Sequence, residues 1–338
     1  MKQVLTYKSF KRDPFFDNVK ILLMLLVVLG HVLPIGQGKL CLSTYEWIFS
    51  FHMPLFVFIS GYFTKIGNND IFVQGILKLG ETYIVFTLIH VFISLFMLGK
   101  GVNFINVLLV PRWTLWYLLS LIWWRLILYI TPFSIRNNHL LLVVISVVLC
   151  LVMGWVPIGH IFSFHRTFSF LPFFVLGYVA AQTGTINRIK MSPILAVALM
   201  IIVLSGYWLF PISIKEYLFQ NYGYNHYSNP SLAFLFRFGW LFFAGLMSVC
   251  FLSIVPRKEY RWTYFGRLTL FIYMYHSVIL LWRSVLRDEY HVPVSFPYCL
   301  LYTIIVLSII YLMSKVKLFH WLLNPVTPII NNRKKRIT

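Results

Sequence analysis

Residues 19–36 read VKILLMLLVVLGHVLPIG, a run in which only Lys20 and His31 can carry a charge. Crossing a bilayer takes about 20 apolar residues in a helix, and runs near that length recur from residue 19 to about residue 318. Lipid offers no partner to an unpaired backbone group, and the runs lack the polar–apolar alternation of barrel strands, so the runs must be helical. We therefore predict spans at roughly 19–36, 46–64, 79–98, 114–131, 139–156, 168–184, 193–211, 232–254, 265–285 and 298–318.

The composition supports the same fold class. Of the 338 residues, 59% are hydrophobic and only 11% are charged, so the chain cannot cover a soluble domain with polar surface. No low-complexity linker or internal repeat divides it. The sequence predicts an all-α, polytopic integral membrane protein with about ten transmembrane helices, in which residues 1–338 form a single transmembrane domain.

We interpret the basic residues behind the formal net charge of +20 as those that orient the protein in the membrane. With the N-terminus placed in the cytoplasm, 20 of the 29 Lys and Arg residues fall on the inner side, eight on the outer side, and Arg125 within a span. This bias predicts that both termini are cytoplasmic. The basic residues lie in short loops and form no aromatic-interleaved patch, so we expect no nucleic-acid partner.

The four cysteines, Cys41, Cys150, Cys250 and Cys299, are scattered along the chain. They show no Cys-x-x-Cys spacing, which argues against a disulfide framework and a thiolate metal site. We expect no metal ion and no bound cofactor.

Ionisable groups at depth are costly in a membrane and therefore call for a reason. Lys20 and His31 are 11 residues apart, close to three helical turns, which places them on one face about 16 Å apart along the axis. Lys20 would lie at the cytoplasmic mouth and His31 past the middle of the membrane. The alternative is a snorkelling lysine and a structural histidine bonded to another helix.

The second predicted span brings His52 into the outer part of the membrane, at a depth from which it can approach His31. Pro54 should kink or open the helix there, which frees backbone groups to line a cavity. Gly61 in the same span is equally suited to close helix packing.

Three further residues are candidates for binding. Trp116 opens the fourth span, Arg166 lies near the outer face where it can bind an anionic or hydroxyl-rich group, and His276 lies near mid-membrane. The alternatives are an interfacial anchor for the tryptophan and packing for the histidine.

Taken in order, these stretches resemble the bacterial membrane family called acyltransferase 3, and in the second span its fucose 4-O-acetylase-like branch. The family's first span has the form Asp-x-x-Arg/Lys, ten residues, then His, which Asp17, Lys20 and His31 fit. Here the basic residue is Lys, which can lose its proton, and not the commoner Arg. The other stretches that carry the resemblance are FHMPLF (51–56), SGY (60–62), LWYL (115–118), LPFFVLGY (171–178) and GRLTLFIYMYH (266–276).

The resemblance implies an O-acyltransferase of the bacterial plasma membrane. Such an enzyme moves an acetyl or succinyl group from cytoplasmic acyl-CoA, a co-substrate such as acetyl-CoA, to a hydroxyl of a cell-surface sugar, polysaccharide or glycolipid. An acceptor hydroxyl is a poor nucleophile, so a base must take its proton, and a neutral imidazole suits that task.

The roles expected of the candidates follow from this chemistry. His31 would be the general base, and His52 and Arg166 would orient the acceptor or stabilise the oxyanion. Lys20, Trp116 and His276 would contribute to substrate binding, Lys20 toward the acyl-CoA. A covalent acyl-histidine remains an alternative to direct transfer.

Other functions stay open on the sequence. A transporter or flippase for a lipid-linked glycan would use the same cationic, aromatic cavity, and release of free CoA would separate the two. A different membrane acyltransferase superfamily uses a His in later spans, whereas here the leading His lies in the first. A purely structural subunit is a further alternative. The acceptor sugar and position, the donor, the leaflet and the oligomeric state are not readable from these residues.

Overall fold

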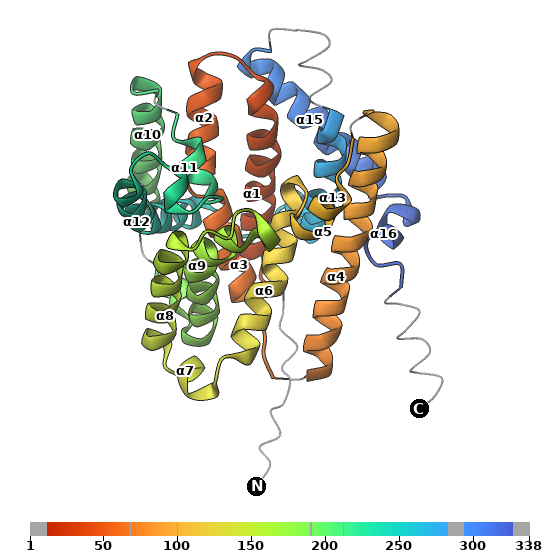
Figure 1. The fold of residues 1–338 in the computed structure, drawn as a ribbon. Coiled ribbons are helices and arrows are strands. Elements are labelled where there is room, and N and C mark those ends of the chain that lie inside the picture. The colour runs from red at the N-terminus through yellow and green to blue at the C-terminus, as the bar shows by residue number, and fades with distance from the viewer. Residues whose placement is uncertain are drawn as a thin grey trace.

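The computed structural model of the protein describes residues 12–67, 69–99, 101–189, 191–211, 213–282 and 294–326. Within these ranges the secondary structure is helical, and the β-type pairing is a single isolated bridge between Gly36 and Val294. In chain order the α-helices shown in Figure 1 are α1 (Pro14–Val32), α2 (Lys39–Phe49), α3 (His52–Tyr62), α4 (Asn69–Phe92), α5 (Phe104–Leu109), α6 (Trp116–Ile130), α7 (Phe133–Asn137), α8 (His139–Val152), α9 (Phe164–Thr183), α10 (Pro193–Leu209), α11 (Lys215–Phe219), α12 (Pro230–Ile254), α13 (Thr269–Ile279), α15 (Phe296–Met313) and α16 (Lys317–Leu323).

Short segments of other helix types extend or join these helices. The π-helical segment η2 (Ile93–Met97) prolongs α4. The others are the 3₁₀ segments η1 (Leu33–Ile35), η3 (Trp113–Leu115), η4 (Met153–Trp155), η5 (Ile161–Ser163), η6 (Thr185–Arg188), η7 (Tyr224–His226), η8 (Arg261–Leu268) and η9 (Leu280–Trp282).

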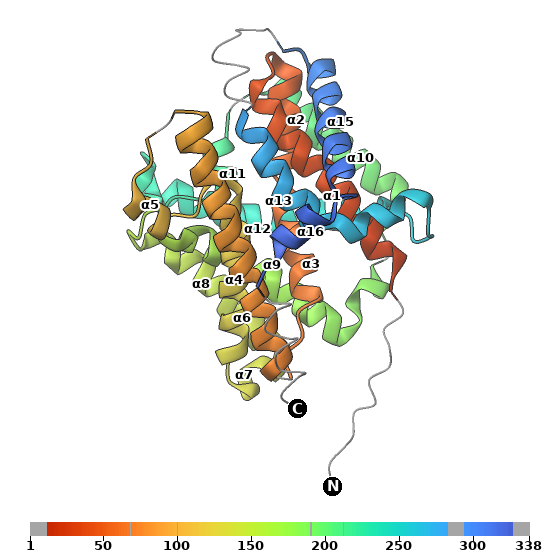
Figure 2. The ribbon, with the colours of Figure 1, turned by 90° about the vertical axis from the view of Figure 1, so that its right-hand side faces the viewer.

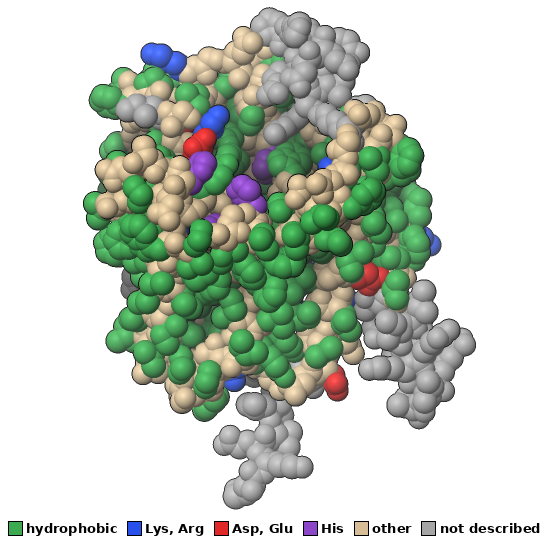
Figure 3. All heavy atoms as spheres, in the orientation of Figure 1, with side chains coloured by type: hydrophobic (Ala, Val, Ile, Leu, Met, Phe, Trp, Pro, Cys, Tyr) green, Lys and Arg blue, Asp and Glu red, His purple; other side chains and the backbone are tan. Residues whose placement is uncertain are grey.

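Several helices are long and apolar enough to cross a membrane. Among the described residues, five segments meet this condition: Pro14–Ile35, Asn69–Met97, Phe104–Ile130, Pro230–Ile254 and Phe296–Met313. Their outward faces are apolar: Leu88 is 62% exposed and Ile304 60% exposed, and Figure 3 shows apolar side chains over most of the visible face. So much exposed apolar surface requires lipid around it. The protein is an all-α, polytopic integral membrane protein, as predicted.

The predicted span boundaries agree with the helices within a few residues at most positions. The span predicted at 79–98 begins earlier, at Asn69, because its first turns are polar and hydropathy does not register them. The last residues of the span predicted at 265–285, which are 283–285, lie outside the described residues, and so do the basic tails at 2–11 and 333–336. The count of ten spans and the cytoplasmic position of both ends stay predictions.

The second predicted span is broken into α2 and α3 at Ser50–Phe51. Phe51 leaves helical geometry, with φ −143° and ψ −20°, and its N–H turns to the carbonyl of Ile48 at 3.3 Å. Pro54 follows in the first turn of α3, where a missing N–H removes no helical hydrogen bond. The predicted opening of the helix is therefore present, and it lies about one turn before Pro54.

Helices α3 and α9 pack backbone against backbone, and they lie side by side in both views of the ribbon (Figures 1 and 2). A Cβ built on Gly61 would overlap the carbonyl of Phe174, and one built on Gly177 would overlap the carbonyl of Phe58. Only glycine allows this approach, as in other membrane helix pairs with small residues at the contact. The interpretation of Gly61 as a packing residue is confirmed.

Helix α1 runs through the middle of the fold. It packs against α2, α3, α13, α15 and the η8 segment. Residues such as Leu23, Val28 and Val32 are fully buried along it. Because α1 carries Lys20 and His31, its position decides where both side chains lie.

We predict that Gly61→Ala weakens the α3–α9 contact, because the added methyl group meets backbone and not a movable side chain. Overpacking of this kind costs about 1–3 kcal/mol, which should lower the thermal unfolding midpoint of the purified protein. Gly245→Ala in α12 is the matched control, since a Cβ there meets nothing within 4 Å. Equal midpoints for the two variants would contradict the prediction.

Candidate functional site

A cavity of about 300 Å³ lies beside the end of α1 that carries His31, and we call it the inner cavity. Four predicted site residues line it, namely His31, His52, Trp116 and Arg166. Its apolar and aromatic wall with a few polar groups is typical of a small-molecule site. The remaining lining residues are Val27, Pro34, Tyr45, Phe49, Met53, Trp113, Thr114, Phe170, Leu218, Phe219 and Tyr273.

The ring of His31 is enclosed by other rings. Its centroid lies 5.1 Å from that of Trp113, 5.4 Å from that of His276 and 5.8 Å from that of Phe49. Trp113 and Phe49 meet it edge to face, a favoured geometry for aromatic pairs. His31 is partly buried, faces the cavity and does not lie on the lipid surface.

His52 is held in one tautomer by the break between α2 and α3. Its Nδ1 lies 2.7 Å from the carbonyl oxygen of Ile48, so Nδ1–H donates and Nε2 keeps its lone pair in the neutral ring. That carbonyl is available because the helix opens at Phe51. His52 is 1% exposed, and its ring contacts Phe49 at 4.7 Å, the same ring that His31 contacts.

Arg166 presents a positive charge at the cavity wall. Its Nε donates to the carbonyl of Phe219 at 3.1 Å, and its guanidinium carbon lies 4.8 Å from the centre of the Trp116 ring. None of the ion pairs among the described residues involves Arg166. A guanidinium with no carboxylate beside it, in a mostly apolar cavity, is suited to stabilise an oxyanion or to hold a hydroxyl-rich group.

Helix α11 covers the inner cavity with Leu218 and Phe219. Glu46 holds the chain that leads into α11, because its carboxylate accepts the backbone N–H of Ile214 at 2.9 Å. Glu46 is 1% exposed, so it is an acidic group at depth that the sequence analysis did not single out. Figure 3 shows histidine side chains gathered in a hollow of this face, between α11 and α5.

Behind His31, the structure brings together two further histidines. His276 is fully buried, and its Nδ1 lies 3.2 Å from the carbonyl of Ile272. Its neighbour Ser277 contacts Nε2 of His90 at 3.0 Å. The sequence analysis missed His90, although an ionisable residue inside the apolar run at 79–98 is itself a signal of function.

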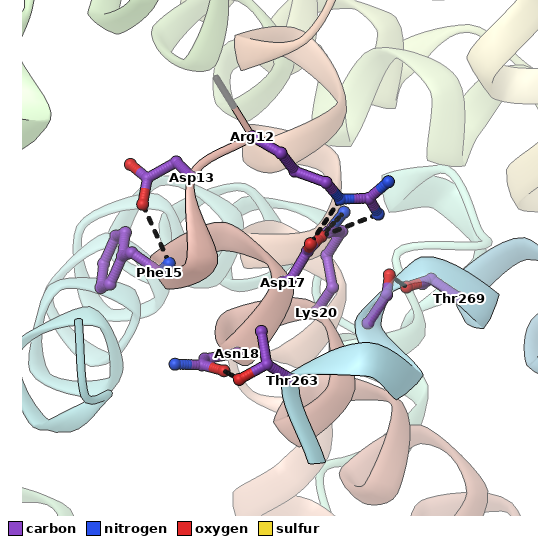
Figure 4. A network of polar contacts seen from close by, with 9 residues as sticks. Arg12, Asp13, Phe15, Asp17, Asn18, Lys20, Thr263 and Thr269 are labelled. Carbon is purple, nitrogen blue, oxygen red and sulfur yellow. Dashed lines mark hydrogen bonds and ion pairs between the residues drawn. The ribbon is translucent and has the colours of Figure 1, made fainter. Parts of the chain in front are cut away.

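Lys20 lies at the other end of α1, in the network of Figure 4. Its Nζ is 2.7 Å from one oxygen of Asp17, and Arg12 approaches the same carboxylate with Nε at 2.5 Å. Two cations thus share one buried carboxylate. Lys20 does not line the inner cavity. On the face of α1 between Lys20 and His31, Met24 and Val27 are both buried, and of these two only Val27 lines the inner cavity.

Asn18, next to Asp17, anchors the start of α1. Its Nδ2 donates to the carbonyls of Pro256 and Lys258, both at 2.8 Å, and its Oδ1 accepts the hydroxyl of Thr263 at 2.6 Å (Figure 4). These bonds join α1 to the chain that leads into α13, which carries His276. The helices that bear His31 and His276 are therefore held together at one end.

The described part of the chain contains no group of three or more His, Cys, Asp or Glu residues placed to hold a metal ion. The four cysteines are buried and form no disulfide with one another.

Comparison with known proteins identifies the family. The sequence model described as "Acyltransferase domain", which defines the acyltransferase 3 family, matches residues 13–315. The "Nodulation protein NolL" of Sinorhizobium fredii (strain NBRC 101917 / NGR234) is 50% identical over 56 residues, which is 15% of this chain and 15% of that protein. No solved structure matches.

The fold and the inner cavity define a multi-pass membrane protein with a histidine- and arginine-lined site. The chain belongs to the acyltransferase 3 family, since the match covers nearly its whole length. Its long apolar helices place it in a lipid bilayer, and the family model that it matches describes an acyltransferase domain. The resemblance to the acyltransferase 3 family is confirmed, and the likeness of the second span to the fucose 4-O-acetylase-like branch stays a prediction.

We predict that Arg166→Lys lowers acyl transfer roughly tenfold to a hundredfold, because an ammonium group cannot both stack on Trp116 and donate through a planar fork. The thermal unfolding midpoint should be unchanged. Arg136→Lys in α7, whose guanidinium packs on the Phe133 ring outside the inner cavity, is the control and should keep full activity. Full activity of Arg166→Lys would contradict the role given to the guanidinium.

Proposed function

We propose that the protein moves an acetyl or succinyl group from cytoplasmic acyl-CoA to a hydroxyl of a sugar, polysaccharide or glycolipid at the surface of a bacterial cell. It would act in the plasma membrane with no resident cofactor, acyl-CoA being a co-substrate. The observation that carries the proposal is the inner cavity, where His31 and Arg166 share a wall that also includes His52.

In the transfer step, the acceptor hydroxyl attacks the carbonyl carbon of the thioester while His31 takes its proton. A new C–O bond forms and the C–S bond breaks, so CoA leaves as a thiolate. The imidazolium of His31 then returns the proton to that sulfur, and the enzyme regains its neutral base. General base catalysis of this kind raises the rate of the chemical step by roughly 10²–10⁴-fold.

The negative charge that develops on the thioester oxygen needs a stabilising group. Arg166 is the nearest such group in the proposal, because its guanidinium faces the cavity without an ion-paired carboxylate. Nε2 of His52 is the lone-pair side of a fixed ring, so it would accept a hydrogen bond from the acceptor and orient it. Trp116 would act through Arg166, because its ring packs against the guanidinium group and holds it in position.

The donor would approach from the end of α1 that carries Lys20. Arg12, Lys20 and Arg257, whose guanidinium lies over the Phe15 ring, outnumber the carboxylates of Asp13 and Asp17 at this end of α1, and such cations suit the phosphates of CoA. The acyl arm would follow the face of α1 toward His31, past Met24 and Val27. Because both residues are buried, this path requires their side chains to move, and Met24 is unbranched and adaptable.

We predict that His31→Ala abolishes CoA release from acetyl-CoA in the presence of acceptor, with a loss of roughly 10²–10⁴-fold, while yield and thermal stability stay near normal. His139→Ala is the matched control, since His139 begins α8 and does not line the cavity. Retained CoA release in His31→Ala would remove His31 from the mechanism. No CoA release by the unaltered protein would instead favour a transporter or flippase for a lipid-linked glycan.

A second prediction concerns the donor. Lys20→Ala should raise the KM for acyl-CoA more than it lowers kcat, because it removes a charge near the expected phosphate position. Lys20→Arg should be tolerated. If Lys20 only neutralises Asp17, Lys20→Ala would lower the unfolding midpoint and leave the KM unchanged, which would refute the donor role.

A further inference from the structure

A second cavity lies next to the inner one and has no role in the steps above. It measures about 490 Å³, and we call it the outer cavity. Its lining comes from the chain between α4 and α6 together with one residue each from α4 and η9, and it includes His90, Asn106, Val107, Val110, Arg112 and Trp113. Trp113 lines both cavities. Trp113 is thus the residue that the two linings share.

The outer cavity offers hydrogen-bonding groups of both kinds. Ser277 uses its hydroxyl proton on the carbonyl of Met274 at 2.7 Å, so His90 must donate to it through Nε2–H. In the neutral ring, Nδ1 of His90 is then an acceptor. That atom is buried and has no hydrogen-bond partner within the described chain, although His90 lines the cavity. A buried acceptor without a partner is costly unless a ligand satisfies it.

Arg112 supplies the donors and the charge. One of its terminal nitrogens donates to the hydroxyl of Ser94 at 2.8 Å, which fixes the side chain against η2. The ion pairs found among the described residues do not include Arg112. Its positive charge is therefore available to an anionic group in the cavity.

The exposure of the residues of α5 indicates that the outer cavity lies near the membrane interface. Phe104, Ile105 and Leu108 are each at least 67% exposed, while Asn106 and Val107 line the cavity. The outward face of α5 is apolar and Asn106 adds a polar group toward the cavity, a combination that suits a short helix at the membrane interface. The cavity thus opens where a sugar chain at the membrane surface can reach it.

The backbone of Trp113 supports a functional role for this junction. Its φ of 39° lies in the left-handed region, which bulky residues rarely adopt. Such strained positions cluster at functional sites. This conformation accompanies a ring that stands 5.1 Å from the ring of His31.

We propose that the outer cavity is the acceptor subsite and binds a saccharide that carries an anionic group, either a carboxylate or a phosphate. The anionic group pairs with Arg112, a hydroxyl donates to Nδ1 of His90, and the sugar ring packs on Trp113. This assignment rests on the proposed function, because it supplies the hydroxyl that His31 deprotonates. Trp113 separates this subsite from the donor and must shift to let the hydroxyl through.

The subsite is testable without any acyl transfer. In full-length protein, Val107→Cys introduces a thiol into the outer cavity, and the four native cysteines are buried, so a charged maleimide should label the new thiol selectively. Glucuronate or glucose 1-phosphate should slow the labelling severalfold, whereas glucose and inorganic phosphate should not. The pair of charged sugars distinguishes a carboxylate from a phosphate. Val110→Cys gives a second labelling position if the first variant folds poorly.

When Arg112→Gln is combined with Val107→Cys, the charged sugars should no longer slow the maleimide labelling. When Arg136→Gln is combined with Val107→Cys, they should slow it as before. Protection by neither charged sugar, equal protection by glucose, or protection that survives Arg112→Gln would overturn the subsite. CoA release by the unaltered protein tests the proposed function separately, so either idea can fail alone.

The separating role of Trp113 has its own measurement. Trp113→Ala should admit water to the thioester and raise CoA release without acceptor relative to transfer, whereas Trp113→Phe should behave like the unaltered protein. An unchanged ratio in Trp113→Ala would show that the indole does not separate the two cavities.

Discussion

The hydrogen bonds of Asn18 are the constraint on which the site depends. One amide side chain satisfies two carbonyls and one hydroxyl of the segment before α13, at a position with no access to solvent. A buried amide that lost these partners would be costly, so the start of α1 cannot slide or rotate against that segment. Because helices are stiff, this anchor also fixes the far end of α1. His31 and His276 meet there, 5.4 Å apart between ring centres.

Two local departures from helical regularity make room for the inner cavity. The break at Ser50–Phe51 divides the second membrane segment, and the carbonyl of Ile48 there accepts both the N–H of Phe51 and Nδ1–H of His52, which orients the His52 ring. Gly61 and Gly177 draw α3 against α9 further down, where the backbones touch. The close packing of α3 on α9 and the break between α2 and α3 leave a space near His31.

The charged groups at the two ends of α1 differ in whether they are paired. At one end of α1, Asp17 holds Arg12 and Lys20 together, whereas at the other end Arg166 and Arg112 take part in no ion pair within the described chain. A cation that is paired with a carboxylate helps to hold the structure together, whereas a cation without such a partner attracts anionic ligands. Trp113 stands between the cavities that Arg166 and Arg112 line, so one aromatic ring lies where donor and acceptor would have to meet.

The sequence alone determined the fold class, the opening near Pro54, the packing role of Gly61 and four of the residues that line the inner cavity. These features are local, because run length, hydropathy and the missing N–H of proline act within a few turns of chain. Only the tertiary structure decided that Lys20 lies away from the inner cavity, that His90 meets Ser277 beside His276, and that Trp113 lines two cavities. Contacts of this kind, such as the one between His90 and Ser277, join residues 187 positions apart. They depend on how helices pack, which no local pattern of apolar residues specifies.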